Sequence, residues 1–123
     1  MANPSTVPAS AAGTEILRRS YAHAITNSPT KIIDGAANYT YTVLNITFYE
    51  CAGDDELIYM HVNIDANAGG APEIWLLNHS LSGNDSFVWN DKIMLAETDE
   101  LVVQTGSSAN VDVYCTYIEQ RCA

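Results

Sequence analysis

The chain has 123 residues, of which 47% are hydrophobic and 16% are charged, so it can bury one core and does not have the composition of a disordered chain. Its 15 acidic residues outnumber its 5 basic residues and give a formal net charge of -10, which disfavours binding to nucleic-acid phosphates. No apolar run approaches the roughly 20 residues that a membrane-spanning helix needs, so we expect no membrane partner either.

Residues 1–13 are predicted to form an extended arm in front of a β-sandwich domain that spans residues 14–123. The segment is rich in Pro, Ala, Ser and Thr and has no charged side chain, which is typical of a linker or arm. It lacks the basic and apolar regions of a secretory signal, so we expect synthesis in a cytosol. Because such an arm commonly gains its order from a partner, Val7 and Pro8 are candidate contacts with a neighbouring subunit.

Residues 14–26 fit either a helix or a strand. A strand would place four side chains on one face: Leu17, Tyr21, His23 and Ile25. We favour the strand because β-branched and aromatic residues are frequent here and the segment closes on a turn that ends with Pro29. The candidate interface residues of this segment are Leu17, Arg18, Arg19 and Tyr21.

Four longer segments alternate apolar and polar side chains with the period of two that a half-buried strand requires. They span residues 39–49, 57–65, 87–95 and 111–119, and the third is interrupted at Asp91. The side chains predicted to face the core are Leu44, Ile46, Phe48, Ile58, Met60, Val62, Ile64, Phe87, Trp89, Ile93, Leu95, Val111, Val113, Cys115 and Tyr117. His61 alternates with the core residues of its segment, so we expect it to be a solvated surface histidine.

Shorter strands are predicted at residues 31–33, 74–78 and 101–105. Turn residues separate all of these strands, with Gly, Asn and Asp at positions that need a reversal of the chain. Strands at this spacing, without a long helical pattern, predict an all-β fold. We expect an antiparallel, jelly-roll-like β-sandwich of about eight short strands.

No motif predicts catalysis, so we expect a protein that is not an enzyme and has no catalytic residue, metal or cofactor. The 3 histidines, His23, His61 and His79, share no metal-ligand spacing. The loop that begins at Asp65 opens like a calcium loop, but Leu76 stands where a bidentate Glu is required, so we predict a turn. The acidic cluster at residues 54–56 is predicted to be a solvated loop.

The cysteines and tryptophans complete the candidate residues. Cys51, Cys115 and Cys122 form an odd set without metal-site spacing, so we predict three free thiols, two of them on strands. Trp89 alternates with core residues, whereas Trp75 is a candidate surface aromatic that could contact a glycan.

The order of elements from Ala36 to Glu119 resembles that of a family of phage proteins. A turn leads into the strand that begins at Tyr41, a strand at 58–64 follows, then the stretch 93–103 and a last strand that ends at Glu119. This pattern is similar to that of small β-sandwich virion structural proteins of tailed bacteriophages, which are head decoration (cement) or tail accessory proteins. Leu95 and Asp99 match that pattern, and Thr98 stands where the family usually has Gly.

The resemblance implies a non-enzymatic protein of the virion, most simply a capsid decoration protein that binds the head lattice as a homo-oligomer. Its partners would then be itself, with a trimer favoured, and other virion proteins such as the major capsid protein. Two alternatives remain open at this point. The chain could be a tail, collar, fibre or baseplate module of the virion, or a carbohydrate-binding β-sandwich module that uses Trp75.

A chain that begins at Thr14 should melt at the same temperature as the full chain but occupy undecorated phage heads less completely. The reason is that residues 1–13 contain only two larger apolar side chains, Met1 and Val7, and can add little to a core. Thermal melts test the first expectation. Mixing each protein with undecorated heads and measuring the occupancy of the heads tests the second. Equal occupancy would remove the role of the arm, and failure to fold would show that the arm is a strand of the sandwich.

Overall fold

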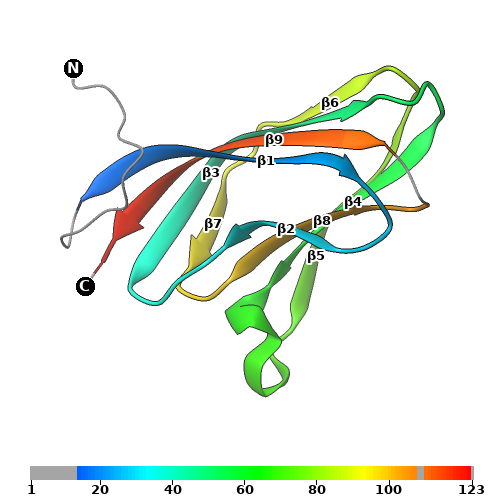
Figure 1. The fold of residues 1–123 in the computed structure, drawn as a ribbon. Helices are drawn as coiled ribbons and strands as arrows, with labels where there is room; N and C mark the ends of the chain where they lie inside the picture. The colour runs from blue at the N-terminus through cyan, green and yellow to red at the C-terminus, as the bar shows by residue number, and fades with distance from the viewer. Residues whose placement is uncertain (1–13, 108–109, 123) are drawn as a thin grey trace.

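The computed structural model describes residues 14–107 and 110–122, which form two β-sheets packed face to face (Figure 1). Val7 and Pro8 lie outside the described residues. The strands are β1 Glu15–Ile25, β2 Thr30–Asp34, β3 Tyr39–Glu50, β4 Glu56–Asn63, β5 Glu73–Leu81, β6 Ser86–Trp89, β7 Ile93–Ala96, β8 Glu100–Thr105 and β9 Val111–Arg121. One short 3-10 element, η1 Ile64–Gly70, lies between β4 and β5. The ambiguous segment 14–26 is therefore a strand, as predicted.

The strands pair in a jelly-roll order. Sheet A has the order β1-β9-β3-β6, with β7 also paired to β3, and sheet B has the order β2-β8-β4-β5. Because β6 and β7 both pair with β3 in an antiparallel sense, they are two halves of one strand that is interrupted near Asp91. Counted in that way, eight strands form two four-stranded layers, the arrangement of a double-sheet jelly roll. The structure confirms the predicted antiparallel sandwich.

The core lies between the inner faces of the two sheets and follows the predicted alternation closely. Its fully buried side chains include Val43, Ile46, Phe48, Ile58, Met60, Leu81, Leu95, Leu101, Val103, Val111 and Cys115. Trp89 and Tyr117 are half-buried and pack against this cluster. Each buried aliphatic or aromatic side chain contributes about 1.5–3 kcal/mol, so these positions supply most of the favourable free energy of folding.

Leu44 departs from the prediction because β3 contains a β-bulge. The register of β3 against β9 shifts between Val43 and Asn45, which leaves Leu44 out of the alternation. Tyr41 and Val43 face the core on one side of the bulge, and Ile46 faces it on the other. Leu44 itself is half-buried, so the prediction that it is a core residue was wrong. The prediction assumed that a single alternation continues along the whole strand, whereas the extra residue of the bulge reverses it at Leu44.

His61 is buried, with an exposed fraction of 4%, and the prediction of a solvated histidine was wrong. The predicted register is correct, since Val62 faces the core and His61 lies on the outer face of sheet B. Trp75 lies opposite His61 on β5, and the two ring centroids are 4.3 Å apart. A neighbouring side chain therefore covers the histidine. Alternation assigns a face of the sheet, but not what covers that face.

β4 ends at Asn63, two residues earlier than predicted, because the following residues adopt a left-handed backbone. Asp65, Ala66 and Asn67 have φ angles of 49°, 53° and 62°, and they form the turn of η1. Figure 1 shows η1 projecting beyond the end of sheet B. The loop that begins at Asp65 is thus a turn, as the sequence predicts.

At one end of the sandwich, Glu50 links the turn after β3 to the turn between β5 and β6 through hydrogen bonds. Its side chain is almost completely buried, and Oε1 accepts hydrogen bonds from the backbone N–H groups of Gly53 (2.6 Å), Asp54 (3.2 Å) and Asn84 (3.4 Å). A Cβ atom at Gly83 would lie 2.3 Å from the backbone of Gly53, so only glycine permits this approach. A buried carboxylate is tolerated here because backbone donors surround it.

Asp99 plays the corresponding role at the other end. Its carboxylate accepts hydrogen bonds from the backbone N–H groups of Asp65 (2.9 Å) and Ala96 (3.0 Å), which ties η1 to the turn between β7 and β8. The backbone carbonyl of Asp99 accepts a further hydrogen bond from Gly35 at 3.0 Å. The position that matches the phage-protein pattern is therefore a turn-stabilising aspartate.

The three cysteines are free thiols, as predicted. Cys115 lies within β9 and is fully buried, and burial raises the pKa of its thiol to about 12. Cys51 follows the end of β3 and Cys122 follows the end of β9, and both are exposed. One cysteine, rather than the predicted two, therefore lies on a strand, because both outer thiols fall just beyond a strand end.

Val62→Asp should unfold the domain, and His61→Ala should destabilise it more mildly. A carboxylate at Val62 would be buried without a partner and cost several kcal/mol, a large part of the stability of a small domain. Removing His61 leaves a gap under Trp75, at a cost of about 1–2 kcal/mol. Urea unfolding measures both, with Lys92→Ala, at an exposed position, as the control. A neutral His61→Ala variant would contradict the packing of Trp75 on His61.

Candidate functional site

The described residues do not gather the groups expected of a metal or catalytic centre. Within residues 14–107 and 110–122, no cluster of three His, Cys, Asp or Glu side chains could hold a metal ion. The three histidines have separate surroundings: His23 contacts Asp112 at 2.7 Å, His61 lies under Trp75, and His79 stacks on Phe87. No helix in the described part of the chain is long and apolar enough to cross a membrane.

The outer face of sheet A is rich in apolar side chains. Across the strands, Leu17 of β1 lies beside Ile118 of β9, and Tyr21 lies beside Tyr114. The same two rows continue through β3 to the paired half-strands, where they end at Met94 and Val88. The large apolar side chains exposed on this face are Leu17, Tyr21, Tyr49, Val88, Met94 and Tyr114. We call this surface the A face.

The A face carries little of the negative charge of the protein. Along the rows between Leu17 and His23, the one acidic side chain among the described strands is Asp112, which is paired with His23 at 2.7 Å. Arg19 lies over the ring of Tyr21, 5.8 Å from its centroid. An apolar pocket of about 360 Å³ lies on this face. Its lining includes Tyr21, Tyr49 and Tyr114. In a chain of net charge -10, this surface is suited to contact with another protein.

The structure places the predicted interface residues of β1 on two different faces. Leu17, Arg19 and Tyr21 lie together on the A face, and Leu17 and Tyr21 are exposed. Arg18 lies on the opposite face, where its guanidinium is 3.1 Å from the carboxylate of Glu119. Val7 and Pro8 cannot be placed, since they lie outside the described residues.

Sequence reasoning missed five members of the A face, which are Tyr49, Tyr114, Ile118, Val88 and Met94. All five occupy outward positions of their strands. The signal was the presence of large apolar residues at positions where alternation predicts polar ones. A contiguous patch of such residues is typical of a surface that contacts another molecule.

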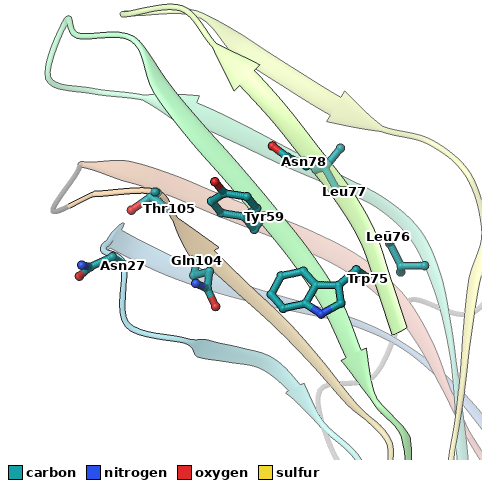
Figure 2. A pocket seen from close by; sticks show the side chains of 9 residues that line it. Asn27, Tyr59, Trp75, Leu76, Leu77, Asn78, Gln104 and Thr105 are labelled. Atoms are coloured by element: carbon teal, nitrogen blue, oxygen red, sulfur yellow. The ribbon is translucent and has the colours of Figure 1, made fainter. Parts of the chain in front are cut away.

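Trp75 belongs to a second surface, the outer face of sheet B. It is 53% exposed, as the sequence suggested for a surface aromatic. Figure 2 shows the rings of Trp75 and Tyr59 next to one another, with Gln104 close by on β8 and Asn27 at the far edge of the pocket. Together with neighbouring residues of β5 and β8 they line a groove of about 710 Å³, which we call the B groove.

A buried charge network joins β2, β8 and β4 of sheet B. Glu100 is 6% exposed, and its carboxylate accepts hydrogen bonds from the ammonium of Lys31 (2.8 Å) and the amide of Asn63 (3.0 Å). The hydrogen bond from Lys31, followed by that from Asn63, holds the pKa of Glu100 below its ordinary value of 4.5, although burial acts in the opposite direction. The same contact raises the pKa of Lys31. The network ties the edge strand β2 to β8 and β4.

The sequence has no match among protein-family models or curated proteins, whereas the fold has many matches among solved structures. A chain of the capsid of Helicobacter pylori bacteriophage KHP30 aligns with a TM-score of 0.51 and 9% identity, over 92% of each chain. A Bacillus endospore appendage protein from disulfide-linked pili aligns with a TM-score of 0.51 and 10% identity, over 97% of this chain and 100% of that one.

A third match comes from a eukaryotic protein. The core of Drosophila NLP, described for pentamer formation and histone binding, aligns with a TM-score of 0.52 and 12% identity, over 89% of this chain and 100% of that one. At these identities the matches establish a shared β-sandwich fold. The fold therefore occurs in a phage capsid protein, in a pilus subunit and in an oligomeric eukaryotic protein.

Low pH should destabilise the protein through Glu100. Because the folded state lowers the pKa of this carboxyl, its stabilising effect is fully present above pH 4.5 and is lost as the pH falls through the folded value. The difference in unfolding free energy between the wild type and Glu100→Gln should therefore be largest near neutral pH and shrink below pH 4.5. Chemical unfolding across that range measures it, with the exposed Glu97→Gln as control. A difference that does not vary with pH would contradict the pairing with Lys31.

Proposed function

We propose that this protein is a non-enzymatic structural protein of a tailed-bacteriophage virion, a decoration or cement protein that binds the head as a homo-oligomer. Its partners are further copies of itself and the major capsid protein, and it joins the virion in the cytoplasm of the host bacterium. The A face is the observation that carries this proposal. The β-sandwich fold shared with a phage capsid chain is compatible with it.

The A face has the composition of a protein interface. Tyr, Met and Arg are enriched where proteins meet, and this face presents Tyr21, Tyr114, Met94 and Arg19. Rigid strands hold these side chains, so little conformational entropy is lost when a partner covers them. A flat apolar sheet face left in water would promote non-specific aggregation, which a functional partner prevents.

Charge favours another copy of the chain as one occupant of the A face. Two molecules that each carry a net charge of -10 repel one another unless the contacting surfaces exclude acidic groups. The A face largely meets this condition, since its acidic residues among the described strands are Glu15, at the start of β1, and Asp112, whose carboxylate contacts the His23 ring at 2.7 Å. Contact through this face allows self-association in spite of the overall charge.

Attachment to a head lattice would work by multivalency. An oligomer presents several identical surfaces at once, so individually weak contacts with capsid subunits add up to strong attachment. We propose a trimer as the unit. A tail, collar, fibre or baseplate position is the alternative within the virion, and the number of copies per particle separates the two: hundreds of copies support the head, and a few support the tail.

Tyr114→Asp should convert the oligomer to monomers or weaken association by about tenfold or more, since Tyr114 lies in the middle of the A face. Light scattering coupled to size-exclusion chromatography measures the mass, which also distinguishes a trimer from a pentamer. Leu57→Asp is the matched control, because Leu57 has similar exposure but belongs to β4 of sheet B.

Circular dichroism confirms that both variants fold. A wild-type protein that remains monomeric at high concentration, or a Tyr114→Asp variant that associates like the wild type, would contradict the role of the A face. If the variant also fails to bind undecorated heads while the control binds, the same face is required for attachment.

A further inference from the structure

We infer that the B groove is a binding site for a neutral saccharide. The groove lies on the outer face of sheet B, on the other side of the sandwich from the A face. Its lining comes from β4, β5, β8 and the turn between β1 and β2. The inference does not depend on the proposed virion role, because none of the residues that line the groove belongs to the A face.

Two aromatic rings form one wall of the groove. The rings of Tyr59 and Trp75 meet edge to face, with an interplanar angle of 88° and centroids 6.3 Å apart (Figure 2). Trp75 is 53% exposed, yet His61 supports it from below with ring centroids 4.3 Å apart. An exposed indole that is fixed in one orientation is a suitable platform for the C–H face of a pyranose ring. The buried His61 thus acts as a positioning residue for the platform.

Amide side chains supply the polar part of the groove. Asn27, Asn78 and Gln104 line it, and their side chains form no hydrogen bonds within the described part of the chain. Each amide offers both donors and an acceptor, which matches sugar hydroxyls that donate and accept at once. Thr105 differs, because its hydroxyl donates to the carbonyl of Ser107 at 2.6 Å. Three amides are therefore free to bind a polyhydroxylated ligand.

The absence of charged side chains from the described lining disfavours ionic ligands. Among the described residues, no Asp, Glu, Lys or Arg lines the groove, although the chain has 20 such residues in all, 15 acidic and 5 basic. No cation is present to compensate a phosphate, sulfate or carboxylate group, and the overall negative charge repels such ligands. A volume of about 710 Å³ lies within the usual range of small-ligand sites. Aromatic rings and uncharged amides together are the chemistry that recognises neutral sugars.

Calorimetric titration with neutral oligosaccharides tests the inference on the full chain. The probes are cellohexaose, maltohexaose, xylohexaose and chitohexaose, with oligogalacturonate as the acidic comparison. We expect saturable binding of at least one neutral probe and none of the acidic one. Trp75→Ala should weaken that binding about tenfold or more, and Gln104→Ala should weaken it several-fold. Tyr21→Ala, which removes an exposed aromatic of the A face, should leave it unchanged.

Two results of the sugar titrations would overturn the inference. One is the absence of heat from all four neutral probes at millimolar concentration. The other is unchanged affinity in Gln104→Ala, a variant that removes no core side chain and therefore stays informative if Trp75→Ala unfolds. Association through the B groove with a second copy of the chain would appear as loss of the oligomer in Gln104→Ala, without sugar binding, and would also overturn it. Failure of the virion proposal appears separately, in the mass and head-binding measurements on Tyr114→Asp.

Discussion

The pairing of β9 with both β1 and β3 is the constraint on which the rest of the structure depends. β9 is the last strand of the chain, and it lies between the first and third strands of sheet A. Its register sets Tyr114 beside Tyr21 and Ile118 beside Leu17, so it builds the A face. The same register brings Arg18 to Glu119 and His23 to Asp112. Because these contacts join the two ends of the described chain, they form only when the whole sandwich closes.

Buried carboxylates hold the turns of this sandwich where the strands leave the sheets. Glu50 and Asp99 accept backbone N–H groups at opposite ends of the molecule, and Glu100 accepts a lysine and an amide at the edge of sheet B. All three avoid the penalty of burial because donors surround them. In a protein with 15 acidic residues, some of the negative charge is thereby used as internal structure. The remaining acids lie largely on loops and edges, away from the A face.

The two outer faces of the sandwich differ in chemistry although the strands are built alike. The A face combines tyrosines and aliphatic side chains with few acidic groups, which suits a protein partner. The B groove combines two rings with uncharged amides, which suits a small polar ligand. A jelly roll can present both surfaces at once because its core uses only the inward-facing half of each strand. The outward half is free to carry function.

Local pattern determined the strands, and tertiary packing determined the surfaces. Alternation in the sequence was enough to predict the sandwich, the inward set that includes Phe48, Met60 and Val113, and the turn at Asp65, since each depends on near neighbours along the chain. It could not predict the bulge at Leu44 or the burial of His61, because the first depends on register against β9 and the second on Trp75 from the neighbouring strand. Nor could it assemble the A face or the B groove. Both join residues from distant strands, and only strand order decides which outward side chains become neighbours.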